Sequence, residues 1–199
     1  MSTAREAILD GVRKGRRSAQ PSSYVLPAWS GDARALFLVK ARASAAVVHE
    51  IATPDDAPAA IWAILNAANA TPRLHIPSAS PLNALPWQRA PGLTLSHEAP
   101  SGSDSAVSRA DFGIAETGTL VFFSGARTPS SWHFLPGSEI VLLQRDVILP
   151  RLEDVIARLG GIMPATVNLV TGPSRTADIE QTIERGAHGP RDVHILVVG

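Results

Sequence analysis

The order of apolar and polar residues predicts helices that alternate with short, almost wholly apolar strands. Strands are predicted at residues 45–51, 73–77, 92–95, 106–112, 121–123, 139–143, 166–170 and 193–198. Helices are predicted at residues 3–16, 32–43, 54–68, 146–159 and 176–185. Strands that are apolar on both sides and alternate with helices are typical of an α/β fold, so we expect a mainly parallel sheet flanked by helices. Residues 106–123 are the exception, because they predict an antiparallel hairpin around a polar turn.

Two of the predicted helix starts depend on capping residues. Thr53 stands directly before Pro54, and two aspartates follow in the first turn, where they lie beside the positive end of the helix dipole. Asp146 is expected to cap the helix at residues 146–159, with Pro150 in its first turn.

The length favours a single domain. A globule of 199 residues buries about 70% of the surface that its unfolded chain exposes, which is enough for one core. The sequence has no internal repeat and no linker that divides it. We therefore expect one domain over residues 1–199, with residues 1–30 forming a peripheral helix and loop.

Composition narrows the function classes. Eighteen basic and eighteen acidic residues give no net charge, so the chain lacks the basic surplus of a nucleic-acid or anionic-membrane binder. No apolar run reaches the length of a membrane span, and the N-terminus has no apolar signal core, so we expect a cytoplasmic protein. Without cysteine, the chain can hold neither thiolate metal sites nor iron–sulfur clusters.

The first candidate site is the polar turn at residues 113–120, Gly-Ile-Ala-Glu-Thr-Gly-Thr-Leu. Glu116 offers a carboxylate, Thr117 and Thr119 offer hydroxyls, and Gly118 permits a positive φ and close approach of a ligand to the backbone. The alternative is that Glu116 is simply the solvated tip of a hairpin and that the threonines serve strand formation.

The second candidate site is the segment 171–180, which combines a strand end, a glycine turn and an expected helix start. Ser174, Arg175 and Thr176 would direct donors at a carboxylate or phosphate, since ligands of α/β sheets bind outside the carboxyl ends of the strands. The alternative is that Ser174 or Thr176 caps the helix and Arg175 pairs with a nearby acid such as Asp178.

The histidines are weaker candidates for functional residues than these two segments. His188 lies between small residues, which leave its imidazole room to exchange a proton with a ligand, although a loop histidine is more often bonded to backbone. His133 and Arg127 stand in a polar loop that can border a pocket. His49, His75 and His194 fall in predicted strands without the spacing of a helical metal site, so no metal is predicted.

Residues 110–119, 172–180 and 188–190 together resemble, in order and spacing, the lactate utilisation (LUD) domain family, and the resemblance covers essentially the whole chain. It implies an α/β fold similar to that of ribose-5-phosphate isomerase and CoA transferases. It also implies a role in oxidising L-lactate to pyruvate beside partner proteins that carry iron–sulfur clusters. One departure is that Gly137, Ser138 and Glu139 follow Pro136, where relatives often have a histidine.

These observations lead to three hypotheses. The first is a non-redox accessory subunit of a lactate-oxidising system, with a pocket for a small carboxylate built from Glu116, Thr117, Gly118, Thr119, Ser174, Arg175, Thr176 and His188. In that pocket Arg175 would hold the carboxylate, and His188 or Glu116 would exchange a proton with the hydroxyl. The second is a free-standing acyl-transfer or phosphosugar enzyme that uses Glu116 as nucleophile or base. The third is a regulatory module that senses lactate.

Overall fold

The computed structural model describes residues 3–15, 25–161, 164–177, 183–185 and 189–199. Contacts divide the chain into two units, Met1–Ser30 and Gly31–Gly199. The first unit contains helix α1 (Ala4–Gly15), which buries none of its residues. In the described part of the chain, no helix combines the length and apolarity needed to cross a membrane.

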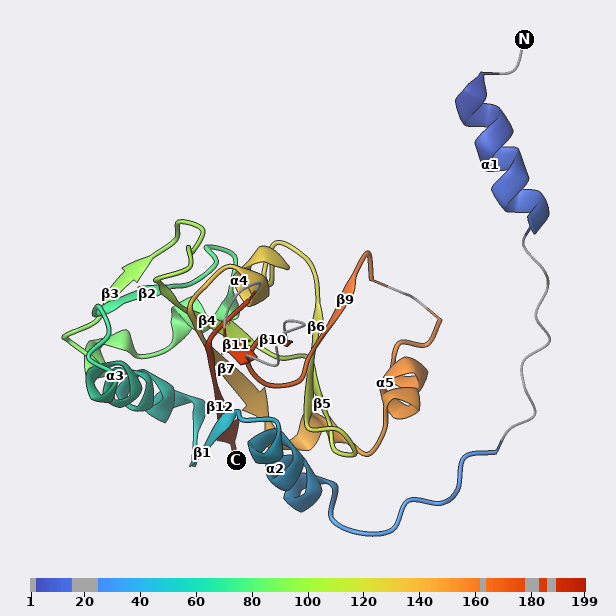
Figure 1. Cartoon of the computed structure of the whole chain (residues 1–199). Helices are drawn as coiled ribbons and strands as arrows, with labels where there is room; N and C mark the ends of the chain where they lie inside the picture. Colours follow the sequence, from blue (N-terminus) through green and yellow to red (C-terminus); the bar gives the residue numbers. More distant parts are fainter. Residues whose placement is uncertain (1–2, 16–24, 162–163, 178–182, 186–188) are drawn as a thin grey trace. The chain divides into compact units, whose positions relative to one another are not determined.

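The second unit is built on a six-stranded sheet in which every neighbouring pair of strands is parallel (Figure 1). Its strands, in spatial order, are β1 (Val47–Ile51), β12 (Asp192–Val198), β7 (Ser138–Gln144), β4 (Ser105–Arg109), β2 (Arg73–His75) and β3 (Thr94–Ser96). The central strands β12 and β7 are buried over most of their length, as their near-continuous apolar sequences predict. The predicted α/β fold with a mainly parallel sheet is confirmed.

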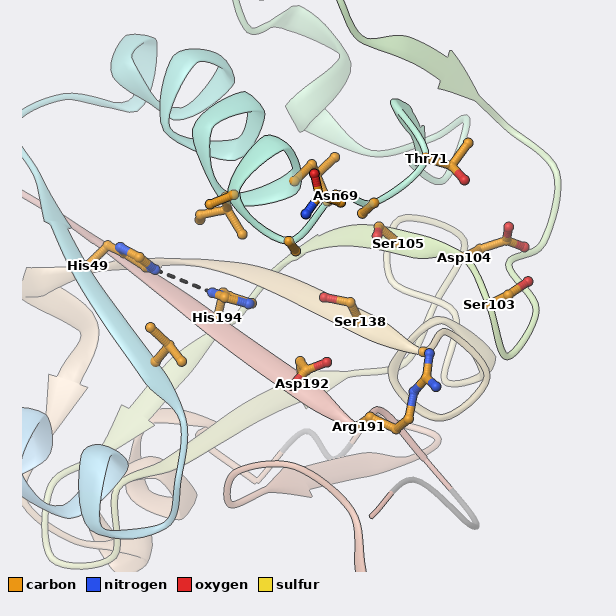
Figure 2. A pocket seen from close by; sticks show the side chains of 17 residues that line it. His49, Asn69, Thr71, Ser103, Asp104, Ser105, Ser138, Arg191, Asp192 and His194 are labelled. Atoms are coloured by element: carbon orange, nitrogen blue, oxygen red, sulfur yellow. Dashed lines mark hydrogen bonds between the residues drawn. The ribbon is translucent and has the colours of Figure 1, made fainter.

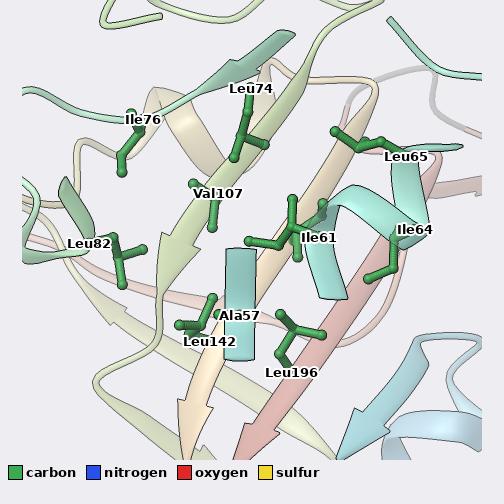
Figure 3. Packing of buried hydrophobic residues seen from close by; sticks show 11 residues of the cluster. Ala57, Ile61, Ile64, Leu65, Leu74, Ile76, Leu82, Val107, Leu142 and Leu196 are labelled. Carbon is green, nitrogen blue, oxygen red and sulfur yellow. The ribbon is translucent and has the colours of Figure 1, made fainter. Parts of the chain in front are cut away.

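Helix α3 (Ala57–Ala67) covers one face of this sheet. It follows a turn of 3-10 helix, η1 (Pro54–Asp56), whose N-cap is Thr53 as predicted, and Thr53 also forms a capping box with Asp56. Ile61 and Leu65 of α3 are buried in one apolar cluster with Val107 of β4 and Leu196 of β12 (Figure 3). The stripe that predicted a helix therefore also anchors it to the sheet.

A second sheet of four strands covers part of the other face. Its order is β8 (Ile148–Leu149), β5 (Phe112–Ile114), β6 (Thr119–Phe123) and β9 (Val167–Val170). β5 and β6 form an antiparallel hairpin as predicted, and β9 pairs antiparallel with β6. The first strand of that hairpin was predicted wrongly, because most of residues 106–112 belongs to β4, which pairs parallel with β7 in the large sheet. A Cβ atom on Gly113 of β5 would lie only 3.0 Å from Leu143 of β7 and 3.1 Å from Phe37, so the two sheets and a helix meet at this glycine.

The described residues of the unit form three further helices, together with short 3-10 turns. Phe37 belongs to α2 (Ala33–Ala43), whose N-terminus is capped by Asp32. The others are α4 (Ser131–Phe134) and α5 (Leu152–Arg158). The turns of 3-10 helix are η2 (Pro81–Ala84), η3 (Trp87–Arg89) and η4 (Arg145–Val147).

The predicted helix at residues 146–159 is wrong in its first half. Ile148 and Leu149 form strand β8, which pairs parallel with Gly113 and Ile114 of β5. Helix α5 begins only at Leu152, and its cap is Arg151, not Asp146. The apolar residues at 148 and 149 suit a strand as well as a helix, and backbone pairing with β5 decided between the two.

The predicted helix at residues 176–185 is also wrong. Its two described ends are strands, β10 (Arg175–Ala177) and β11 (Ile183–Arg185), which pair antiparallel. No helix therefore begins at Ser174 or Thr176, and the helix N-terminus expected to bind an anion there does not exist. The branched residues Thr176 and Ile183 are compatible with strands, which sequence reasoning underweighted.

Candidate functional site

The polar turn between β5 and β6 packs against helix α2. Glu116 and Thr117 are exposed at its tip, whereas Gly118 is buried with φ of +70°. A Cβ atom on Gly118 would overlap the backbone nitrogen of Ala41 and lie 2.5 Å from the carbonyl carbon of Lys40. The open side of this glycine is therefore filled by the helix backbone, and the glycine is required for packing of the turn.

The second glycine turn contacts the same helix end. Gly172 has φ of +74°, and a Cβ atom there would overlap the carbonyl oxygen of Ser44, the C-cap residue of α2. Both predicted motifs thus converge on the C-terminal end of α2, which explains a glycine in each of them.

A chain of hydroxyl groups joins the two motifs. Thr119 Oγ1 lies 2.7 Å from Thr117 Oγ1 and 2.6 Å from Thr171 Oγ1. Thr119 is buried, and Thr171 directly follows strand β9. The structure therefore brings together polar residues that are 52 positions apart.

Between the two sheets lies a buried polar cluster of Ser108, His133 and Glu139. Glu139 Oε1 accepts a hydrogen bond of 2.7 Å from Ser108 Oγ and lies 2.6 Å from His133 Nδ1. The side chains of His133 and Glu139 have no exposed surface. The imidazole also stacks on Phe122 of β6, with ring centroids 3.8 Å apart.

Two atoms of this cluster have no hydrogen-bond partner among the described residues, His133 Nε2 and Glu139 Oε2. Buried polar atoms without partners are rare, and each requires a specific reason such as a ligand. If His133 Nδ1 donates its proton to the carboxylate, Nε2 carries a lone pair and can act as a base. Glu139 then holds the ring in orientation and stabilises the imidazolium that forms.

His133 lines a cavity of about 210 Å³, called here the motif cavity. Its described lining is His133, Phe134, Leu169, Val170, Thr171, Gly172, Ser174, Gly189 and Pro190. The Ser174 N–H donates to the Pro190 carbonyl at 2.8 Å, which ties the two turns together. Because drug-sized ligands occupy roughly 300–1,000 Å³, this cavity suits a smaller molecule.

The predicted site residues are distributed unevenly around the motif cavity. Ser174 lines it, and Thr119 reaches it through Thr171, whereas Glu116 and Thr117 lie on the exposed turn and are not among its described lining residues. Arg175 is exposed at the start of β10. The side chain of Thr176 and the whole of His188 lie outside the described residues.

Sequence reasoning missed Ser108 and Glu139, and it gave His133 only a loop position. The sequence did contain a signal for this cluster, because Glu139 places a carboxylate and Ser108 a hydroxyl inside otherwise apolar strands. Buried strands rarely carry such a group unless it has a polar partner. Their convergence depends on the pairing of β4 with β7.

A second hollow of about 430 Å³ lies beyond the carboxyl end of β4, and its lining includes Arg109, Asp111 and Arg127. Burial raises the pKa of the Asp111 carboxyl. Four influences oppose this rise, namely the hydrogen bond from the Phe123 N–H at 2.7 Å and the electrostatic effects of Arg109, Arg127 and His133. This cleft places two guanidinium groups near a carboxyl that binds a proton more readily than usual.

The described residues include no group of three or more His, Asp or Glu side chains able to hold a metal ion. The fold and the site together define an α/β protein with a small cavity that is lined in part by the buried His133 of a His–Glu pair. The LUD domain model matches residues 35–198, and the chain belongs to this family.

Curated relatives share part of this sequence. The chain is 33% identical over 107 residues to lactate utilization protein C of Geobacillus kaustophilus. This match covers 51% of this chain and 45% of that protein. It is 32% identical over 118 residues to lactate utilization protein C of Halalkalibacterium halodurans, and this match covers 56% of this chain and 51% of that protein. The matched parts thus span about half the length of these relatives.

A solved structure supports the fold. A DUF162 family protein from Deinococcus radiodurans matches 83% of this chain and 98% of its own with a TM-score of 0.57. The sequence identity of 19% shows the shared fold alone.

Proposed function

We propose that this protein acts in lactate utilisation and that its motif cavity binds a small hydroxycarboxylate such as L-lactate. The relatives named lactate utilization protein C support the metabolic role. The observation that carries the site is the buried His133–Glu139 pair, whose unpartnered Nε2 belongs to a side chain of that cavity. A carboxylate-backed imidazole is suited to accept the proton of a substrate hydroxyl.

In this proposal the substrate carboxylate accepts hydrogen bonds from Ser174 and Thr171, and Arg175, the residue after Ser174, supplies positive charge. His133 takes the hydroxyl proton as the carbon–oxygen bond becomes a carbonyl. The bond between the carbinol carbon and its hydrogen also breaks, so that this second proton passes to solvent and the two electrons pass to an acceptor. Because the chain has no cysteine, we assign that acceptor to partner proteins that carry iron–sulfur clusters. This chain is then the non-redox subunit.

The acyl-transfer alternative has less support. It requires Glu116 to attack a substrate held in a pocket, yet Glu116 is exposed and is not among the described residues of the motif cavity. The lactate-sensing alternative uses the same cavity and differs only in the absence of turnover.

Reconstitution tests the proposal. Lactate-dependent reduction of an artificial electron acceptor is measured anaerobically with this chain alone, with the iron–sulfur partner proteins alone, and with all together. We expect activity only from the complete mixture. We expect a loss of about 100-fold or more with His133→Gln, because general base catalysis contributes about 10²–10⁴-fold.

His97→Gln is the control, since His97 is exposed and its Nδ1 lies 3.0 Å from the Ile76 carbonyl oxygen. Full activity of the partner proteins without this chain would refute the subunit role. Lactate binding that His133→Gln abolishes, without turnover in any mixture, would instead establish the sensor.

A further inference from the structure

The cavity at the amino ends of the large sheet does not favour an anionic ligand. It has a volume of about 640 Å³, and Figure 2 shows His49 and His194 facing each other in it from β1 and β12. Nε2 of His49 and Nδ1 of His194 lie 3.3 Å apart, so the two members of this histidine pair bond to each other. The charged side chains of the described lining are Arg191 and two acids, Asp104 and Asp192, which give a negative balance.

The hollow of about 430 Å³ beyond the carboxyl end of β4 has the opposite balance. Among its described lining residues, Arg109 and Arg127 face a single acid, Asp111, and we call it the arginine cleft. Both guanidinium groups act electrostatically on Asp111, yet neither forms a salt bridge with a carboxylate of the described residues. The cleft therefore holds two positive charges that a ligand can pair with.

The strand order places the arginine cleft where open α/β sheets bind ligands. β2 and β4 are neighbours, but the chain leaves β2 for β3 on one side and leaves β4 for β7 on the other. Leu82 and Trp87 of the first connection pack in the apolar cluster of α3, whereas β5 in the second connection packs on the other face, against Leu143. Such a reversal is a topological switch point, which opens a crevice at the carboxyl ends of the strands. Ser80, from the connection after β2, and Arg109, the last residue of β4, both line the cleft.

We infer that the arginine cleft binds a phosphate monoester, that is, a small organic molecule that carries a phosphate group. The donors come from three segments, with Ser80 after β2, Arg109 at the end of β4, and Arg127 and Thr128 in the loop after β6. A phosphate group presents three terminal oxygens in three directions and can accept from all three segments. A carboxylate presents only two oxygens in one plane. Guanidinium groups are also well suited to phosphate, with which they form strong charge-assisted hydrogen bonds.

A smaller hollow gives room for the organic part of the ligand. It has a volume of about 150 Å³ and shares Pro81 and Arg109 with the arginine cleft. Leu82, Leu85 and Leu142 line it. A ligand whose phosphate pairs with Arg109 can therefore place a small apolar group against these leucines. This inference does not depend on the proposed lactate chemistry, because these residues do not line the motif cavity.

Isothermal titration calorimetry with phenyl phosphate at pH 7 tests this site, because this probe combines a phosphate with one apolar ring. We expect one probe molecule per chain and weaker binding of inorganic phosphate, which has no ring. Arg109→Gln or Arg127→Gln should weaken phenyl phosphate binding by about tenfold or more, since each removes charge-assisted hydrogen bonds. Arg158→Gln is the matched control, because Arg158 is exposed on α5 and does not line the cleft.

Asp111→Asn should change the affinity in the opposite direction. It removes the negative charge of Asp111 and keeps a side-chain oxygen that can accept the Phe123 N–H. We expect phenyl phosphate to bind about fivefold more tightly, since a like charge a few ångströms away is lost.

Circular dichroism confirms that each variant is folded. Absence of phenyl phosphate binding to the parent would overturn the inference. Equal binding by the parent and both folded arginine variants would overturn it too, and so would unchanged or weaker binding by Asp111→Asn.

Discussion

Replacing Gly118 by alanine tests whether the polar turn is locked against helix α2. The substitution forces a residue with a Cβ atom into φ of +70°, which costs about 1–3 kcal/mol for a non-glycine residue. The new atom also overlaps the backbone at Ala41, and overpacking of this kind costs a further ~1–3 kcal/mol. Backbone atoms in a helix cannot turn aside as a flexible side chain can, so we expect about 3 kcal/mol in total.

For a domain of 150–250 residues each kcal/mol lowers the Tm by about 2–4 °C, so we expect a fall of about 10 °C. Thermal unfolding followed by circular dichroism measures it. Gly102→Ala is the matched control, because a Cβ atom there meets nothing within 4 Å and its φ is not positive. If the Gly118→Ala protein had the same Tm as the Gly102→Ala control, the packing of this turn on α2 would be refuted.

Three further predictions concern stability. Glu139→Leu should lower the free energy of unfolding by about 3 kcal/mol in urea denaturation, because it leaves His133 buried without its partner; a loss below about 0.5 kcal/mol would contradict the burial of this pair. Asp32→Ala should cost about 1 kcal/mol through loss of the α2 cap, and an unchanged urea midpoint would argue against that cap. Burial lowers the pKa of His49 and His194 below the usual value of about 6.5. Because these histidines then bind protons more readily in the unfolded chain, the free energy of unfolding should fall as the pH drops from 7 through about 6.5. Urea midpoints between pH 7 and pH 5 measure that slope, and a double His49→Gln, His194→Gln variant with the same slope would assign it elsewhere.

Local signals predicted much of the fold. Thr53 and Pro54 marked a helix start, and the apolar runs of β7 and β12 marked buried parallel strands. One error arose where apolar residues satisfy two periodicities. Ile148 fits either a helix or a strand, and only pairing with Gly113, 35 positions away, decides for the strand.

The candidate site was less predictable, because its chemistry depends on tertiary pairing. The glycine motifs were found as short patterns, but their contacts with α2 have no local signature. Glu139 becomes a partner of His133 only when β7, β4 and α4 are assembled. The histidine pair is even less local, since 145 positions separate its members.

The position of β12 between β1 and β7 also determines when the protein can fold. During synthesis, β1 emerges early, but its partner β12 comes some 140 residues later. Until then β1 has no partner strand in the large sheet, and β7 has β4 on one side only. At the usual synthesis rate of about 5–20 residues per second, β1 waits about 7–30 s on the ribosome. The large sheet is therefore completed only after β12 has left the ribosome, and the unpaired edges of β1 and β7 must be protected from aggregation during that interval.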